Sequence, residues 1–238
     1  MKNYRDRAVV MRSWPLGEAD RIVEMYGMEA GKLRAVSKGV RGRRSRNSGL
    51  MQVTAEVDVM LWRGRDLDTL VQAALVRPNL VGPEIELDAY QAACELIETV
   101  DRLTPDRQPN PQIYRLLSTG LRMIAEEWSP FLLGSLLLRL LQLEGYAPLV
   151  GACSLCGRRD RLERFDFGSS SARCSDCGGE PVAPEVIAVV QRVLDARVRE
   201  VLAQRPGPEA GGFEGLVARL VAEHAGRSLR SAGVRLTP

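Results

Sequence analysis

Histidine is almost absent from this chain of 238 residues, because His224 is the only one. Mechanisms that need two histidines, or a histidine beside a nucleophile, therefore have little material. The sequence also lacks the G-x-x-x-x-G-K-[ST], G-x-G-x-x-G, H-E-x-x-H and G-x-S-x-G motifs. Nucleotide hydrolysis, dinucleotide chemistry and two common kinds of hydrolase thus have no support. These absences favour a binding protein over an enzyme, with His224 packed at the edge of a helical core.

Long apolar runs are missing as well. The most apolar stretch is Phe131–Leu141, which includes Arg139. A membrane-spanning helix needs about 20 apolar residues. Residues 1–12 are charged throughout and have no apolar region of the kind found in signal peptides. We therefore expect a cytoplasmic protein with no membrane partner.

Acidic residues are scarce in one third of the chain. The whole sequence carries 33 Lys+Arg and 30 Asp+Glu, a formal net charge of +3. Residues 1–80 hold 15 of the basic and 9 of the acidic residues, a net charge of +6, which leaves −3 for the remainder. This distribution predicts a polyanion-binding domain joined to a nearly neutral scaffold.

Hydrophobic periodicity divides the chain into a β part and a helical part. From Val53 to Trp62, apolar and polar residues alternate with the period of two of a half-buried strand. Four shorter strands are expected at 8–14, 19–26, 32–40 and 67–76. Five strands in about 80 residues favour a small closed barrel, of which the OB-fold is the commonest nucleic-acid-binding version. An SH3-like barrel or an open meander has nearly the same pattern.

The period becomes helical after Pro78. Helices are expected from Ile85 to Pro105, from Pro111 onward, from Pro130 to Gly145, from Pro184 through Val201, and around residues 213–221. The predicted class is therefore α+β. We expect an OB-fold domain at 1–80, an α-helical domain at 81–150 and 181–238, and a four-cysteine insert at 151–180.

Four of the five cysteines follow the spacing of a zinc site. Two CxxC pairs, separated by 17 residues, are formed by Cys153, Cys156, Cys174 and Cys177. This pattern is typical of structural zinc, since four thiolates complete a tetrahedral shell and leave no open position. Residues 162–167 are expected to fold as a hairpin that brings the second pair alongside the first. The alternative is two redox or disulfide pairs. Cys94, beside two alanines, is expected to be a small core residue.

A basic segment without acids is the main candidate for nucleic-acid contact. Its cations are Arg34, Lys38, Arg41, Arg43, Arg44 and Arg46, and small residues between them indicate a flexible loop. Such a loop can follow a phosphate backbone. Lys2, Arg5 and Arg7 are further candidates on the barrel. A solvated loop that only aids solubility is the alternative. Trp62, on the polar phase of its strand, is either a stacking platform or a packing residue at the barrel end.

Several stretches resemble the bacterial RecO family of DNA repair and recombination mediators. They are Leu16–Val23, Gly31–Lys32 with Val36–Arg41 and Ser45, and Leu140–Pro148 followed by Cys153–Gly157. The resemblance covers nearly the whole chain and is weakest after residue 185. One departure is Ser170–Ala172, where relatives often have glycines, and many relatives lack complete cysteine pairs.

This resemblance implies an OB-fold, a helical domain and a zinc module. It also implies binding of single- and double-stranded DNA, strand annealing and help in loading recombinase onto covered single strands. The implied partners are RecR, RecF and the single-stranded DNA-binding protein, and the implied location is the nucleoid. Two other hypotheses stay open: an RNA-binding or ribosome-associated module with an OB barrel and a zinc ribbon, and an adaptor whose basic loop binds an acidic protein tail.

Overall fold

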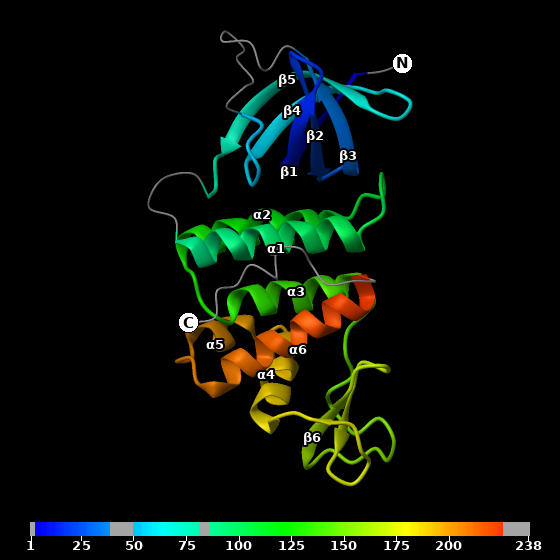
Figure 1. Cartoon of the computed structure of the whole chain (residues 1–238), viewed down its shortest axis with the longest axis vertical. Coiled ribbons are helices and arrows are strands. Elements are labelled where there is room, and N and C mark those ends of the chain that lie inside the picture. The colour runs from blue at the N-terminus through cyan, green and yellow to red at the C-terminus, as the bar shows by residue number, and fades with distance from the viewer. Residues whose placement is uncertain (1–2, 39–49, 81–85, 226–238) are drawn as a thin grey trace. The chain divides into compact units, whose positions relative to one another are not determined.

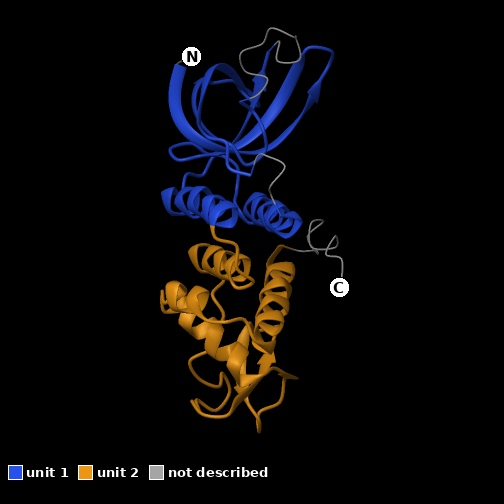
Figure 2. Cartoon of the chain, turned by 90° about the vertical axis from the view of Figure 1, so that its left-hand side faces the viewer, with its two compact units in different colours: residues 1–126 blue, residues 127–238 orange. Residues whose placement is uncertain are grey.

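The computed structural model describes residues 3–38, 50–80 and 86–225. The chain divides into two compact units, residues 1–126 and residues 127–238 (Figure 2). The first unit holds the predicted barrel together with the first two helices. The second holds the other helices and the cysteine-rich insert. The domain boundaries expected near residues 80, 150 and 180 stay predictions.

The first five strands close into a barrel in the order β1-β2-β3-β5-β4 (Figure 1). They are β1 (Asn3–Leu16), β2 (Asp20–Gly27), β3 (Gly31–Ser37), β4 (Glu56–Trp62) and β5 (Asp68–Arg77). Neighbouring strands are antiparallel except β3 and β5, which run parallel and share only three residue pairs. The predicted closed five-stranded barrel is therefore confirmed.

The alternating pattern of β4 sorts its side chains as predicted except at Glu56, which is buried at the start of the strand. Val57, Val59 and Leu61 are buried, whereas Asp58 and Trp62 are exposed, because successive side chains of a strand point to opposite faces. The strand begins later than the pattern suggested, since Thr54 has a φ of +78° and turns the chain just before it. The buried side chains of the barrel core are Ala8, Val10, Val23, Met25, Leu33, Ala35, Met51, Ala55, Val57, Val59, Leu61 and Leu70.

Helices α1 (Leu87–Leu103) and α2 (Pro111–Glu126) complete the first unit. The Tyr114 hydroxyl on α2 donates a hydrogen bond of 2.5 Å to Glu56 on β4. At Gly31, at the start of β3, φ is +68°, and a Cβ there would lie 2.4 Å from the backbone oxygen of Gln108. Only glycine fits where the segment between the helices passes this close to the barrel. Cys94 on α1 is half-buried, less enclosed than predicted.

The described part of the second unit, residues 127–225, is built from four helices and a small sheet. Its helices are α3 (Leu132–Leu143), α4 (Pro184–Leu194), α5 (Val198–Ala203) and α6 (Pro208–Ala225). Phe131 and Phe213 meet in its core with ring centroids 6.1 Å apart. Gly134 on α3 makes room for the Phe213 ring, since a Cβ there would lie 2.6 Å from it. No described helix has both the length and the apolar character needed to span a membrane.

One long helix predicted from Pro184 through Val201 is wrong, because the structure divides it into α4 and α5. Ala196 adopts a φ of +61°. The backbone N–H of Ala196 donates to the Val193 oxygen, and that of Arg197 donates to the Arg192 oxygen. This pair of bonds is the Schellman arrangement that ends a helix, usually with glycine in the left-handed position. Alanine gave no such signal in the sequence.

Candidate metal centre and nucleic-acid interface

The four clustered cysteines come together at one point of the second unit. The sulfur atoms of Cys153, Cys156, Cys174 and Cys177 all lie within 4.8 Å of one another. The Cys156 and Cys174 sulfurs are 3.7 Å apart. Four sulfurs placed tetrahedrally at about 2.3 Å from a zinc ion would be about 3.8 Å apart. The site could therefore hold one metal ion, with no ligand position left for a substrate.

A small hairpin and two similar turns position these sulfurs. Strands β6 (Leu162–Asp166) and β7 (Ser171–Cys174) pair antiparallel, with β8 (Glu180–Pro181) on the other side of β6, which confirms the predicted hairpin. Each CxxC pair is followed by a glycine with a positive φ: +75° at Gly157 and +73° at Gly178. The Gly157 N–H also donates to the Cys153 oxygen at 2.9 Å. These turns allow both cysteines of a pair to face inward.

The thiols of the cluster differ in their pKa. The pKa of Cys153 is lowered to about 6, chiefly because backbone N–H groups of Cys156 and Cys174 donate to its sulfur. The pKa of Cys177 is raised to about 12, first by its hydrogen bond with Cys174 and then by the other two cysteine sulfurs. One thiolate is thus favoured, whereas further negative charge is opposed. A divalent cation stabilises several thiolates together, since its own charge offsets their repulsion.

Much of the predicted basic site falls outside the described residues. These residues are Lys2, Arg41, Arg43, Arg44 and Arg46. Lys38 is described, and it is exposed directly after the end of β3. The proposed role of this segment in DNA contact stays a prediction.

Arg34 and Arg7 are already engaged by acids. Arg34 on β3 lies 3.0 Å from Asp106 and 3.3 Å from Glu24. Arg7 on β1 forms two hydrogen bonds with Asp58 on β4, of 2.7 and 3.0 Å. Both arginines remain about half exposed. A phosphate contact by either would have to compete with an existing carboxylate partner.

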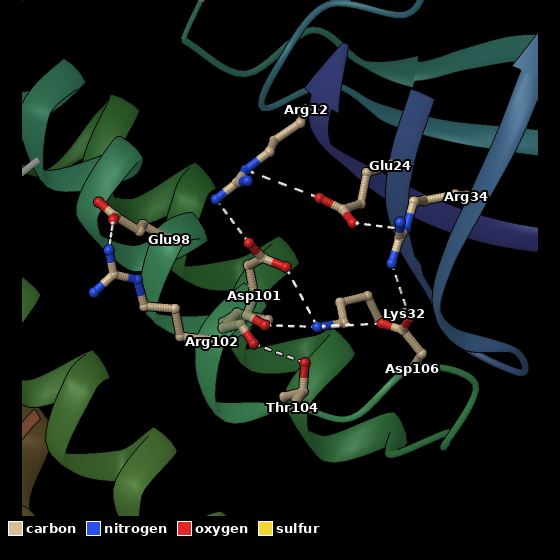
Figure 3. A network of polar contacts seen from close by, with 10 residues as sticks. Arg12, Glu24, Lys32, Arg34, Glu98, Asp101, Arg102, Thr104 and Asp106 are labelled. Atoms are coloured by element: carbon tan, nitrogen blue, oxygen red, sulfur yellow. Dashed lines mark hydrogen bonds and ion pairs between the residues drawn. The ribbon is translucent and has the colours of Figure 1, made fainter. Parts of the chain in front are cut away.

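The acids that engage Arg34 belong to a wider network across β1, β2, β3 and α1 (Figure 3). The Lys32 ammonium donates to the Asp101 backbone oxygen at 2.6 Å and lies 3.3 Å from carboxylate oxygens of Asp101 and Asp106. Arg12 reaches Asp101 at 2.7 Å. The cations of β1 and β3 therefore bind α1 and the residues directly after it to the barrel. Sequence reasoning missed this because the partners of Lys32 lie about 70 residues away.

A second connection of this kind involves Arg107, which the sequence gave no reason to select. Its guanidinium donates two hydrogen bonds to Asp68, of 2.9 and 3.1 Å. Asp68 is fully buried and also accepts from the Tyr4 hydroxyl and the Gly64 N–H. Burial alone would raise the pKa of Asp68, but these hydrogen bonds together hold it below its ordinary value. This cluster ties the segment after α1 to the end of the barrel.

The arginines of the cysteine module are mostly satisfied locally. Arg158 bonds Asp176 at 2.5 Å, and Arg164 donates to the backbone oxygens of Ser175 and Gly179. His224 is half-buried and stacks on Tyr146, with ring centroids 4.5 Å apart.

The structure thus defines a class: a five-stranded OB-type barrel followed by a helical region that carries a four-cysteine cluster. Two family models match the chain, Recombination protein O N terminal at residues 1–79 and Recombination protein O C terminal at residues 86–232. A protein named DNA repair protein RecO from Nocardioides sp. is 39% identical over 96% of this chain and 97% of its own length. One of the same name from Cutibacterium acnes is 34% identical over 97% and 98%. The chain belongs to the RecO family of DNA repair proteins.

Proposed function

We propose that the chain is a DNA-binding, strand-annealing recombination mediator of the RecF type. The observation that carries the proposal is the acid-free basic run at residues 34–46, which begins on β3 and continues in sequence past its end, in a member of the RecO family. Cations on a loop neutralise phosphates with little dependence on base sequence. Both single and double strands are therefore suitable ligands.

Annealing follows from this kind of contact. Two complementary strands repel each other through their phosphates, and a basic surface that holds both lowers this barrier. Because contacts to phosphate leave the base edges free, the bases of the two strands can still pair. The arginines act as counterions in this proposal, so no catalytic residue is assigned and the chain is not an enzyme.

The proposed cofactor is one structural Zn²⁺ per chain, held by Cys153, Cys156, Cys174 and Cys177. The sulfur spacing and the absence of an open ligand position support it. When bound, the ion supplies folding free energy to the module and no chemistry. Elemental analysis should find about one zinc per chain. A folded protein without metal and with two disulfides would contradict this assignment.

The proposed partners are RecR, RecF and the single-stranded DNA-binding protein, in the cytoplasm at the nucleoid. Their support is family membership alone. In a reconstituted reaction, the chain together with RecR should speed the loading of recombinase onto single-stranded DNA covered by its binding protein. An unchanged loading rate would contradict the mediator role and leave DNA binding intact.

Annealing of complementary oligonucleotides tests the central proposal. Wild-type protein should accelerate annealing at moderate salt, with or without the binding protein on the strands. Charge reversal of Arg41, Arg43 and Arg44 to Glu should lower DNA affinity by at least about tenfold, because several phosphate contacts are lost. The matched control reverses the exposed Arg115, Arg199 and Arg205, which lie outside the barrel, and should change affinity little.

The same assay separates the alternatives. Tighter binding to matched RNA, with no DNA annealing, would favour the RNA-binding or ribosome-associated module. Unchanged DNA affinity in the charge-reversed loop variant would favour an adaptor that binds an acidic protein tail.

A further inference from the structure

The outer surface of β1, β4 and β5 carries an exposed aromatic residue and, on the neighbouring strand, a cation that has no ion pair in the described part of the chain. Residues opposite each other in the register are Asn3 and Trp62, Arg5 and Met60, and Met60 and Gln72. The register of β5 shifts between Met60 and Leu61, which leaves Val71 as an extra, half-exposed residue there. We call this surface the Trp62 face, made up of Asn3, Arg5, Met60, Trp62, Val71 and Gln72.

Trp62 is only partly enclosed by its neighbours. The residue is 43% exposed, and among the described residues no ring contact or hydrogen bond involves it. The end of the barrel core is filled instead by Tyr4, whose hydroxyl bonds Asp68 and whose ring has the Arg63 guanidinium 5.0 Å from its centroid. An indole left open in this way offers a flat apolar surface and an N–H that has no hydrogen-bond partner among the described residues.

The charges around Trp62 favour an anionic ligand. Arg5 is exposed and forms no ion pair among the described residues. Arg63 and Arg65 come one and three residues after Trp62, are also exposed, and are followed by one exposed acid, Asp66. Asp58 is engaged by Arg7 and Asp68 by Arg107. The exposed Glu29 lines the same hollow as Arg5 and Met60, so the cations at the Trp62 end of the face are the less opposed ones. The opposite side of the barrel differs, because its cations are paired with Asp101 and Asp106 (Figure 3).

We propose that the Trp62 face is a stacking site for unpaired bases of single-stranded DNA. A base stacks on the Trp62 indole, with Met60 and Val71 extending the apolar surface, while Arg5 and Arg63 contact the adjoining phosphates. Stacking of bases on aromatic side chains flanked by cations is the usual basis of single-strand binding without sequence preference. A duplex keeps its bases stacked inside and cannot use this surface. The inference rests on the proposed DNA binding and adds a preference for unpaired strands.

Binding of oligo-dT and of a duplex by Trp62 variants tests this proposal. Trp62→Ala should weaken oligo-dT binding about tenfold, as expected for loss of one stacked base, and leave duplex binding unchanged. Trp62→Phe should retain most of the affinity, because it keeps a ring. Arg5→Gln should lower the slope of log affinity against log salt by about 0.7 for a single-stranded ligand, one phosphate contact. Trp62→Ala should not change that slope.

Two further arms separate structural effects from recognition. An oligonucleotide with abasic sites should bind the wild type and Trp62→Ala equally well, because nothing is left to stack. Leu16→Ala is the matched control, since Leu16 is a similarly exposed apolar residue at the far end of β1, and it should bind oligo-dT normally. Melting temperatures of all variants should match the wild type.

The outcomes are distinct from those of the annealing assay. Normal oligo-dT binding by Trp62→Ala, in a protein that still requires the basic loop for DNA, overturns the stacking site and leaves the proposed function intact. An equal loss of single- and double-strand binding overturns it too, because stacking acts only on unpaired bases. If Trp62→Ala instead loses only binding of a protein partner, the face is a protein-docking surface and the proposal is wrong. If the wild-type protein bound no DNA, that result would contradict the proposed function itself.

Discussion

The barrel and the cysteine module are both small β structures, but they are stabilised in different ways. The barrel buries twelve side chains in one apolar cluster. The module, residues 151–182, fully encloses few apolar side chains besides its cysteines, namely Phe165 and Ala172, and leaves Leu155 63% exposed. A β unit with so little core needs another source of folding free energy, such as a metal or disulfides. The comparison teaches that the barrel depends on packing and the module on its four sulfurs.

Loss of the proposed zinc ion should therefore have the largest effect, and only on the module. Cys174→Ser, or a strong chelator, should unfold strands β6 to β8, since structural zinc contributes on the order of 10 kcal/mol to such sites. Hydrogen exchange should show lost protection at Phe165 and Ala172, while amides of the barrel core stay protected. Equal loss of protection in both regions would remove the contrast between them.

Truncation in the barrel core should have the next largest effect. Leu61 is fully buried in the cluster, and Leu61→Ala should lower the free energy of unfolding by about 3 kcal/mol, from lost burial and the remaining cavity. Leu155→Ala in the module, at an exposed position, should change it by less than about 0.5 kcal/mol. Denaturant unfolding followed by one probe in the barrel and one in the module measures both. Similar costs at the two positions would contradict this account.

Asp68, the buried acid at the barrel end, should make the stability of the barrel depend on pH. Because hydrogen bonds from Arg107 and Tyr4 keep the pKa of Asp68 below its ordinary value of 3.8, the ionised form is the stabilising one in the folded state. Its contribution is complete above pH 3.8 and is lost as the pH falls through the folded-state pKa. Asp68→Asn should cost about 2 kcal/mol at neutral pH.

Acid unfolding of the variant checks the sign of this effect. The stability of Asp68→Asn should fall less steeply below pH 3.8 than that of the wild type. Replacement of the exposed Asp88 by Asn should leave the neutral-pH stability nearly unchanged. If the stabilities of Asp68→Asn and wild type fell equally steeply below pH 3.8, the cluster of Asp68, Arg107 and Tyr4 would not stabilise the barrel end.

The exposed ion pair of the barrel should have the smallest effect. Arg7 and Asp58 are each about half exposed, so solvent screens their attraction. A double-mutant cycle with Ala at both positions should give a coupling energy below about 1 kcal/mol that decreases with salt. A larger coupling energy that does not change with salt would mean that this pair stabilises the barrel as strongly as its buried contacts do.

Local sequence patterns predicted the helices and strands well, because these elements depend on interactions between residues that are close in the sequence. Alternation identified β4, and the CxxC spacing identified a cluster that the structure brings together. The helix break at Ala196 escaped, because an alanine in a left-handed conformation carries no compositional signal. The engagement of Arg34 by Asp106 also escaped, since residues 72 positions apart meet only after the helices pack on the barrel. Such a basic pattern reports where cations lie in the sequence and not which of them remain unpaired.

The closure of the barrel has a mechanical consequence. Strands β3 and β5 are joined by only three residue pairs, the last of which is Ser37 with Leu70. Lys38, the second cation of the basic segment, follows one residue later, so a pull on the segment beyond β3 enters the folded barrel at Ser37. The force then acts first on the pairing of β3 with β5, which has the fewest residue pairs of the barrel. Tension on a DNA strand bound by this segment would thus act where the barrel is closed by its shortest strand pairing.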